Sequence, residues 1–378
     1  MSAAPAKVVT HGCRSNLAER DALAALAPSG ATVINSCAVT AEAARDARAA
    51  ARAATGPVYV TGCAATLDPA RFADIATIIP NARKLSPQAW GRAGPPAAAV
   101  TRQSRAFVAV QDGCDHACTF CVTRLARGAS RSVPVDEALA RIAALDAPEI
   151  VLTGIDTTSY GQDLPGKPTL GALVQAILAQ TGVRRLRLSS LDSAEADDAL
   201  IEAFADPRLM PHVHLSLQSG DDLILKRMKR RHSRADAIRL VERLKSRRPD
   251  IAIGADLIAG FPTEGEAAHA NSLSLLTEAD IVHAHIFPYS PRPGTAAARM
   301  PQVSPHIAKA RAAQLREAAA QRLHSFQSTF LGTPLETVSE GKSGITPHGL
   351  KIRYSEPQPR GAIVQATPAS IENGQIFQ

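Results

Sequence analysis

The chain has little cysteine, few aromatic residues and no long apolar run. Its 378 residues include six cysteines, one tryptophan and 4% aromatic residues in total. Six cysteines in so long a chain argue against a disulfide framework, so reduced thiols are expected. No apolar stretch approaches the about 20 residues that a membrane-spanning helix needs, and no signal peptide opens the sequence. We therefore expect a cytoplasmic protein with no membrane partner and few exposed rings for stacking on nucleic-acid bases.

Three of the six cysteines lie close together, at Cys114, Cys118 and Cys121. Separations of four and three residues allow one loop to hold three thiolates around an iron–sulfur cluster. Three protein ligands on a four-iron cluster leave one iron open, and that iron can bind a small molecule. From the spacing alone, a zinc site with His116 as the fourth ligand is the alternative.

The other three cysteines, Cys13, Cys37 and Cys63, each follow a short β-branched run. The alanine-rich stretches between them predict helices at 16–27 and 40–54. Alternating strands and helices predict a parallel sheet, and the ends of parallel strands gather at one edge. The three cysteines are therefore expected to meet in space. They are either small buried core residues or the ligands of a second cluster with an open iron.

The same alternation continues after a Pro/Gly-rich linker. We expect an α/β chain with four segments. A three-layer parallel α/β domain at 1–90 is followed by a linker at 91–104, a second α/β domain at 105–330 and a small all-β domain at 331–378. Six strands are predicted in the second domain, at 106–111, 149–153, 183–189, 212–217, 251–258 and 282–288. By pattern alone, these units fit either an open sheet or a partial barrel.

The formal net charge of +7 is compatible with a polyanionic partner. The densest basic run is 226–232, at the end of a predicted helix. Positive charge there also complements the helix dipole, so a solvated helix end is the alternative. Arg184, Arg185 and Arg187 form a second basic cluster that is a candidate for phosphate contacts.

The cysteine motifs and their surroundings resemble the radical S-adenosylmethionine (SAM) methylthiotransferases over essentially the whole chain. The motifs that carry the resemblance lie at His11–Glu19, Ile34–Thr40, Val60–Ala64, Val110–Gly128, Val151–Gly161, Leu215–Gly220 and Phe287–Thr295. Within the family, the Asp112, Thr153 and Phe287 motifs look most like the tRNA branch that acts on N6-threonylcarbamoyladenosine. The intervals between the first three cysteines are shorter than is typical of the family.

The resemblance implies two 4Fe-4S clusters and SAM as cofactors. Cys114, Cys118 and Cys121 would hold the SAM-cleaving cluster, and the other three cysteines an auxiliary cluster that carries a sulfur species. One SAM would methylate that sulfur, and the radical made from a second would remove hydrogen from C2 of the adenine at tRNA position 37. The family fold is a partial (βα)6 radical SAM barrel between the N-terminal domain and a small TRAM-like RNA-binding barrel.

The resemblance also implies individual contacts. The residues expected near SAM are Phe120, Gly154, Gln218, Gly254 and Gly260. The residues expected near the substrate are Asp156, Arg127, Tyr289 and Arg292. No catalytic general base is assigned, because an aromatic C–H bond is too inert for acid–base chemistry and the cofactors must supply the reactivity.

The implied partners are the anticodon stem-loop of tRNA, SAM, a sulfur donor and a flavodoxin-like or ferredoxin-like electron donor. Two alternatives remain open. A sibling enzyme would act on isopentenyl-adenosine in tRNA or on a ribosomal protein aspartate. A non-catalytic iron–sulfur protein would only bind RNA, whereas an electron carrier would need four ligands per cluster, which six cysteines do not provide.

Overall fold

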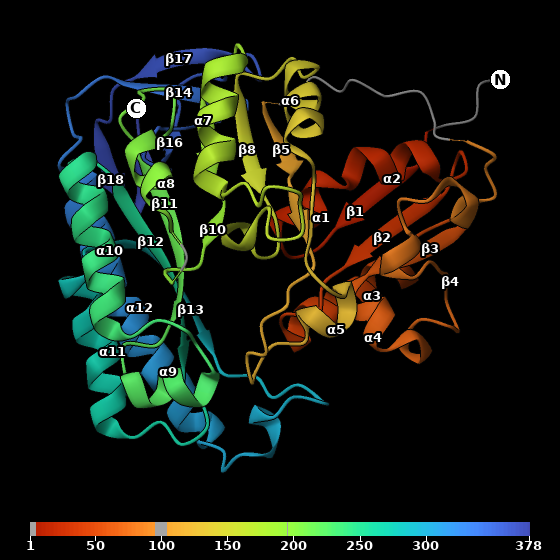
Figure 1. The fold of residues 1–378 in the computed structure, drawn as a ribbon, viewed down its shortest axis with the longest axis horizontal. Coiled ribbons are helices and arrows are strands. Elements are labelled where there is room, and N and C mark those ends of the chain that lie inside the picture. The colour runs from red at the N-terminus through yellow and green to blue at the C-terminus, as the bar shows by residue number, and fades with distance from the viewer. Residues whose placement is uncertain (1–4, 95–103, 195) are drawn as a thin grey trace.

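The computed structural model describes residues 5–94, 104–194 and 196–378 and arranges them around three groups of strands (Figure 1). The expected linker at 91–104 lies mostly outside the described residues. No helix within the described ranges is long and apolar enough to cross a membrane.

The N-terminal strands form a parallel sheet in chain order: β1 (Lys7–Thr10), β2 (Thr32–Ser36), β3 (Val58–Gly62) and β4 (Thr77–Ile78). Strand β2 is buried throughout because helices cover both faces of the sheet. Val33 packs in one core with α2 (Arg20–Leu26), and Ile34 packs in another with α3 (Ala41–Ala53). The expected three-layer parallel arrangement is confirmed.

Local sequence explains how these helices begin and end. The single helix expected at 16–27 is two helices, α1 (Arg14–Ala18) and α2, which meet at Glu19. Glu19 is buried, and its carboxylate is bound by two cations from other segments, which fixes the break. Helix α3 begins where the Thr40 hydroxyl accepts a hydrogen bond from the Ala43 amide at 3.1 Å.

The second group is the expected partial (βα)6 barrel. Its strands are β5 (Arg105–Ala109), β8 (Glu149–Thr153), β9 (Leu186–Leu188) with its continuation β10 (Ser190–Leu191), β11 (His212–Gln218), β12 (Ala252–Ala259) and β13 (Ile281–Pro288). All pairings between them are parallel. The sheets β5-β8-β9 and β10-β11-β12-β13 follow one another around the barrel, because the chain runs from β9 directly into β10. The six predicted strands are confirmed, and their observed ends differ from the predicted ends by only a few residues.

Helices cover the outer side of this barrel (Figure 1). They are α6 (Val135–Ala143), α7 (Leu170–Gln180), α8 (Asp198–Ala203), α9 (Asp222–Met228), α10 (Arg234–Arg247) and α11 (Glu266–Glu278). The long helix α12 (Pro305–Ser328) packs on β12 and β13. Apolar residues of the strands and of these helices form one core, which leaves the carboxyl ends of the strands free for a site.

The C-terminal segment forms a six-stranded sheet in the order β17-β14-β15-β16-β19-β18, as expected for an all-β module. The strands are β14 (Leu335–Ser339), β15 (Ser343–Ile345), β16 (Lys351–Arg353), β17 (Ile363–Ala366), β18 (Ser370–Glu372) and β19 (Gln375–Phe377). The sheet lies against the amino-terminal ends of the barrel strands. Gly349 lies so close to His212 that a Cβ atom there would be 2.9 Å from the imidazole.

A buried ion-pair network joins this module to the barrel. Glu149 is fully buried, and its carboxylate accepts hydrogen bonds from Arg185 (3.1 Å) and Arg187 (2.8 Å). Arg187 also donates to the main-chain oxygens of Thr346 and Pro347, both at 2.9 Å. The expectation that this arginine cluster contacts RNA phosphates is therefore wrong for Arg185 and Arg187, because both side chains are buried and paired inside the protein.

We expect Glu149→Gln to destabilise the protein by about 3 kcal/mol or more, because it leaves the buried Arg187 guanidinium without a counter-charge and Arg185 with only the exposed Glu336. Urea unfolding followed by circular dichroism measures the change. The matched control is Glu336→Gln, since Glu336 also binds Arg185 (3.0 Å) but its side chain is 44% exposed. The control should lose no more than about 1 kcal/mol, and equal losses in the two variants would contradict the account.

Candidate active site

The N-terminal cysteines lie where three neighbouring parallel strands end. Thr10 is in register with Asn35, and Asn35 with Thr61, so the ends of β1, β2 and β3 lie level with one another. Cys13 follows β1 and precedes α1, Cys37 follows β2, and Cys63 follows β3 as the first residue of α4 (Cys63–Leu67). The shared direction of the strands thus brings three thiols from distant parts of the sequence to one edge.

The surroundings of these thiols favour the uncharged form. Burial, together with smaller contributions from the neighbouring Cys13 and Cys63, raises the pKa of the Cys37 thiol to about 11. Burial also raises the pKa of the Cys63 thiol. A metal that binds here must displace protons, and the resulting thiolates are the form that ligates iron.

The loop cysteines follow the first barrel strand, after β6 (Gln111–Asp112), at the carboxyl rim of the barrel. The Cys121 sulfur accepts a hydrogen bond from the Thr123 amide (3.4 Å) at the start of α5 (Thr123–Arg127). Burial raises the pKa of the Cys118 thiol, whereas the Arg230 guanidinium opposes this shift from 3.7 Å. All six cysteines are free of disulfide bonds.

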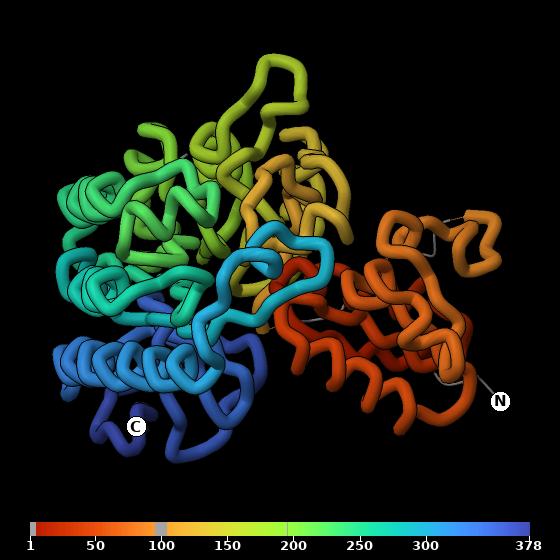
Figure 2. The backbone as a smooth tube through the Cα atoms, turned by 90° about the horizontal axis from the view of Figure 1, so that it is seen from below, coloured from red at the N-terminus to blue at the C-terminus, as the bar shows by residue number. Residues whose placement is uncertain are grey.

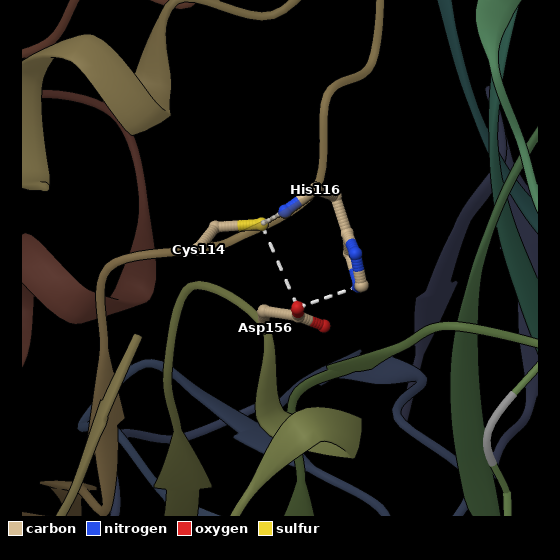
Figure 3. A group of neighbouring side chains, drawn as sticks. All are labelled: Cys114, His116 and Asp156. Carbon is tan, nitrogen blue, oxygen red and sulfur yellow. Dashed lines mark hydrogen bonds and ion pairs between the residues drawn. The ribbon is translucent and has the colours of Figure 1, made fainter. Parts of the chain in front are cut away.

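Asp156 and His116 flank the first loop cysteine (Figure 3). The Cys114 thiol donates a hydrogen bond to the Asp156 carboxylate at 3.5 Å, and the His116 imidazole lies 2.8 Å from the same carboxylate oxygen. Burial, and then the Asp156 charge, raise the pKa of the Cys114 thiol to about 12. Asp156 was expected to contact the substrate, but the structure places its carboxylate on the cysteine loop instead.

Residues of the basic run at 226–232 also contact this cysteine loop. Arg230 pairs with Asp192 at 2.8 Å in addition to its contact with Cys118. The Arg231 guanidinium lies 2.6 Å from the His116 imidazole. A positive segment after α9 is therefore held against the cysteine loop, where it can offset the negative charge of a thiolate-bound cluster.

Neither cysteine triad brings its three sulfur atoms close enough together to surround one ion in the described part of the chain. Within the described ranges, two groups of three side chains bring their ligand atoms within 4.8 Å of one another, and these are Cys114, His116, Asp156 and His214, Asp256, His285. Neither group is a cysteine triad. The zinc alternative, with three cysteines and His116 around one ion, is therefore not the arrangement formed.

Arg127 connects the two cysteine groups. Its side chain is 1% exposed and pairs with Glu19 (3.2 Å) and Asp112 (2.6 Å), and it donates to the Asn16 side chain at 2.6 Å. Its charge also opposes the pKa increase of Cys63, of which it is a hydrogen-bond partner. Arg127 was expected to contact the substrate, but both terminal nitrogens of its guanidinium are engaged in this buried network.

A cavity of about 590 Å³ lies between the N-terminal sheet edge and the barrel. Cys13 and Cys37 line it on one side, and Phe120 of the cysteine loop lines it on another. Figure 2 shows the segment at 288–300 extending from the barrel toward the N-terminal residues, over this region. The volume is within the range of small-molecule sites. We refer to this space as the central cavity.

The structure separates the expected contact residues into two sets. The members that line the central cavity are Phe120, Gly154, Gln218, Tyr289 and Arg292. Gly254 and Gly260 do not line it. A Cβ atom at Gly254 would be 2.6 Å from the His214 imidazole, and Gly260 has φ +71° and lies against Ala308 of α12. Packing by itself accounts for glycine at these two positions.

Four ionisable residues of the cavity wall were missed by the sequence reasoning, namely Arg14, His214, Asp256 and His285. His214 lies 3.0 Å and His285 3.4 Å from the same Asp256 oxygen. Burial would raise the pKa of Asp256, but hydrogen bonds from the two imidazoles outweigh it and leave the pKa lowered. The available signal was a polar residue at an inward position of a strand that is otherwise apolar.

Comparison with known proteins gives a consistent relationship. The profile of the radical SAM superfamily matches residues 108–276. The threonylcarbamoyladenosine tRNA methylthiotransferase MtaB of Rickettsia prowazekii is 44% identical over 278 residues, which cover 72% of this chain and 66% of that protein. A tRNA-2-methylthio-N(6)-dimethylallyladenosine synthase of Maricaulis maris is 39% identical over 257 residues, 65% of this chain and 56% of that protein.

A solved structure supports the fold alone. The radical S-adenosylmethionine methyltransferase TsrM of Kitasatospora setae superposes with a TM-score of 0.54 over 75% of this chain and 66% of that chain, at 14% identity. The present chain spans about half to two thirds of the length of the curated relatives it matches.

We expect Arg127→Gln to lower the free energy of unfolding by about 3–5 kcal/mol, because it removes one partner from a buried charged network. Urea unfolding of the metal-free protein measures this change. Arg131→Gln is the matched control, since Arg131 pairs with Asp112 at 3.0 Å but its side chain is 56% exposed. If both variants unfold at the same urea concentration, Arg127 does not hold the two cysteine groups together.

Proposed function

Because the chain belongs to the radical SAM superfamily, we propose that it is a tRNA methylthiotransferase that modifies C2 of N6-threonylcarbamoyladenosine at tRNA position 37. One observation carries this proposal: two of the three sheet-edge cysteines, Cys13 and Cys37, border the same cavity as Phe120, which lies in the loop of the second cysteine triad. A single triad would fit many radical SAM activities. The second triad adds a place for a sulfur-bearing cluster, and the relatives named for threonylcarbamoyladenosine support the substrate.

The residues present suit the cofactors that this activity needs. Cys114, Cys118 and Cys121 would hold the cluster that binds SAM, and Cys13, Cys37 and Cys63 would hold the auxiliary cluster. When bound, these groups supply the one-electron chemistry and the sulfur that an inert aromatic carbon requires. The protein supplies the geometry and the charge balance of the site.

Several side chains of this chain have definable tasks. Arg230 lies beside the Cys118 sulfur and compensates negative charge on the loop. Phe120, Gly154 and Gln218 line the part of the cavity next to that loop, which is the part available for SAM. Tyr289 and Arg292 border the cavity from the segment after β13, where a base that enters from the RNA would pass.

The proposed partners follow from this chemistry. They are the anticodon stem-loop of tRNA, SAM, a sulfur donor and a flavodoxin-like or ferredoxin-like electron donor, all in the cytoplasm. The net charge of +7 supports a polyanionic substrate. The short C-terminal sheet is the proposed TRAM-like RNA-binding module, with Lys351 and Arg353 on its strand β16.

A sibling activity is the second candidate. The 39% identity to a dimethylallyladenosine synthase supports isopentenyl-adenosine as an alternative substrate. The two candidates share both clusters and differ only in the group on N6 of the adenine.

Mass spectrometry of tRNA nucleosides from cells with and without this gene tests the substrate. We expect 2-methylthio-N6-threonylcarbamoyladenosine to disappear with the gene and its precursor to accumulate. A plasmid copy should restore the product, and a Cys37→Ala copy should not. Loss of a methylthio-isopentenyl nucleoside instead would favour the sibling activity and contradict the proposed substrate.

Anaerobic reconstitution tests the two clusters. We expect about eight irons per chain, the sum of two four-iron clusters, and about half when Cys114, Cys118 and Cys121 are replaced by alanine. Cys37→Ala should still release 5′-deoxyadenosine from SAM in dithionite, because the loop cluster remains, but it should form no methylthio product. Retention of zinc in place of iron, or product formation by Cys37→Ala, would contradict the mechanism.

A further inference from the structure

Arg14 occupies an unusual place in the central cavity. It follows Cys13, it is the first residue of α1, and it lines the cavity together with Cys13 and Cys37. Its guanidinium makes no hydrogen bond or ion pair with any residue in the described part of the chain. Most other cavity-facing charges are matched, as Asp256 is by His214 and His285. A half-buried cation without a partner calls for an anionic ligand.

The fold directs Arg14 toward the barrel. Helix α1 packs against β5 and β8, at the open edge of the partial barrel. Burial lowers the pKa of Arg14, as do the charges of Arg187 and Arg105, whereas Glu149 and Asp256 oppose this shift, and all four of these residues stand on barrel strands. The N-terminal domain thus places one arginine in the space where the barrel would present SAM to a substrate.

Arg292 is the other cavity arginine without a hydrogen-bond partner for its Nε and Nη2 atoms. It borders both the central cavity and a second cavity of about 390 Å³ next to Ala38 and Ala64. The charges near it are those of Cys37 and Arg71. Arg292 therefore faces the auxiliary cysteines, whereas Arg14 faces the barrel interior.

We propose that Arg14 binds the carboxylate of the threonylcarbamoyl group and so selects an anionic N6 substituent over a hydrocarbon one. This inference rests on the proposed function. A guanidinium presents a planar fork of donors that matches a carboxylate, and an isopentenyl group offers it no acceptor. An enzyme built for isopentenyl-adenosine would leave this cation unpaired in its substrate complex, at the cost of burying an uncompensated charge.

The test compares three anticodon stem-loops that differ at one nucleoside. They carry N6-threonylcarbamoyladenosine, its methyl ester, or isopentenyl-adenosine. The dissociation constant of each RNA and that of SAM are measured with the reconstituted holoenzyme, for wild type, Arg14→Gln and Arg14→Lys. Arg20→Gln is the matched control, since Arg20 lies on α2 with its side chain 44% exposed.

Wild type should bind the acid about tenfold or more tightly than its ester, as expected for a hydrogen bond to a charged group. Arg14→Gln should bind the acid as weakly as wild type binds the ester, and Arg14→Lys should keep part of the preference. The affinity of Arg14→Gln for SAM should be unchanged, and Arg20→Gln should bind all three RNAs and SAM as wild type does. The 2-methylthio product formed by Arg14→Gln from the acid should fall in proportion to the lost affinity at low RNA concentration.

Three results would overturn the role of Arg14 while the proposed function stands. Arg14→Gln could keep the acid-over-ester preference. The substitution could weaken binding of the acid and the ester RNA equally, which would assign the contact to an RNA phosphate. It could weaken binding of SAM alone, which would assign the contact to the SAM carboxylate. A wild-type enzyme that methylthiolates only the isopentenyl RNA would instead refute the proposed function itself, and the role of Arg14 with it.

Discussion

The ion pairs of Arg127 fix the two halves of the candidate site against each other. Arg127 comes from the helix just after the loop cysteines and reaches Glu19 and Asn16, which lie between the first two N-terminal strands. Lys84 binds the same Glu19 carboxylate at 2.5 Å, so three segments share one buried charge centre. Breaking one partner of such a network is costly, which makes the relative position of the two cysteine groups well defined. Everything proposed for the cavity depends on that position.

Strand direction then determines what faces the cavity. Both sheets beside it are parallel, and in both the functional residues follow the carboxyl ends of strands. The opposite end of the barrel is covered by the C-terminal module, where His283 contacts the main-chain oxygen of His348 at 3.0 Å. Helix α1 lies along the open edge of the barrel. The cavity is thus bounded by the N-terminal sheet edge, the barrel strands and the segment after β13.

Much of this architecture was predictable from local sequence. The β-branched runs that end at Cys13, Cys37 and Cys63 became level strand ends, because the direction of parallel strands follows from the alternation of strands and helices. Long-range side-chain pairing was not predictable. Arg127 and Arg187 were read as available cations because their partners, Glu19 and Glu149, lie far away in sequence. Gly254 and Gly260 were taken for cofactor contacts, although crowding by His214 and Ala308 explains them.

The most direct test of the central claim is an electron paramagnetic resonance measurement on the fully reconstituted, dithionite-reduced protein. The account places both iron–sulfur clusters at one cavity, joined through Arg127. It therefore predicts that the spectrum with both clusters reduced is broadened or split relative to the sum of the spectra of two variants, each lacking one cysteine triad. A spectrum equal to that sum would show that the clusters do not share a cavity, and a signal from only one cluster would show that one triad holds none.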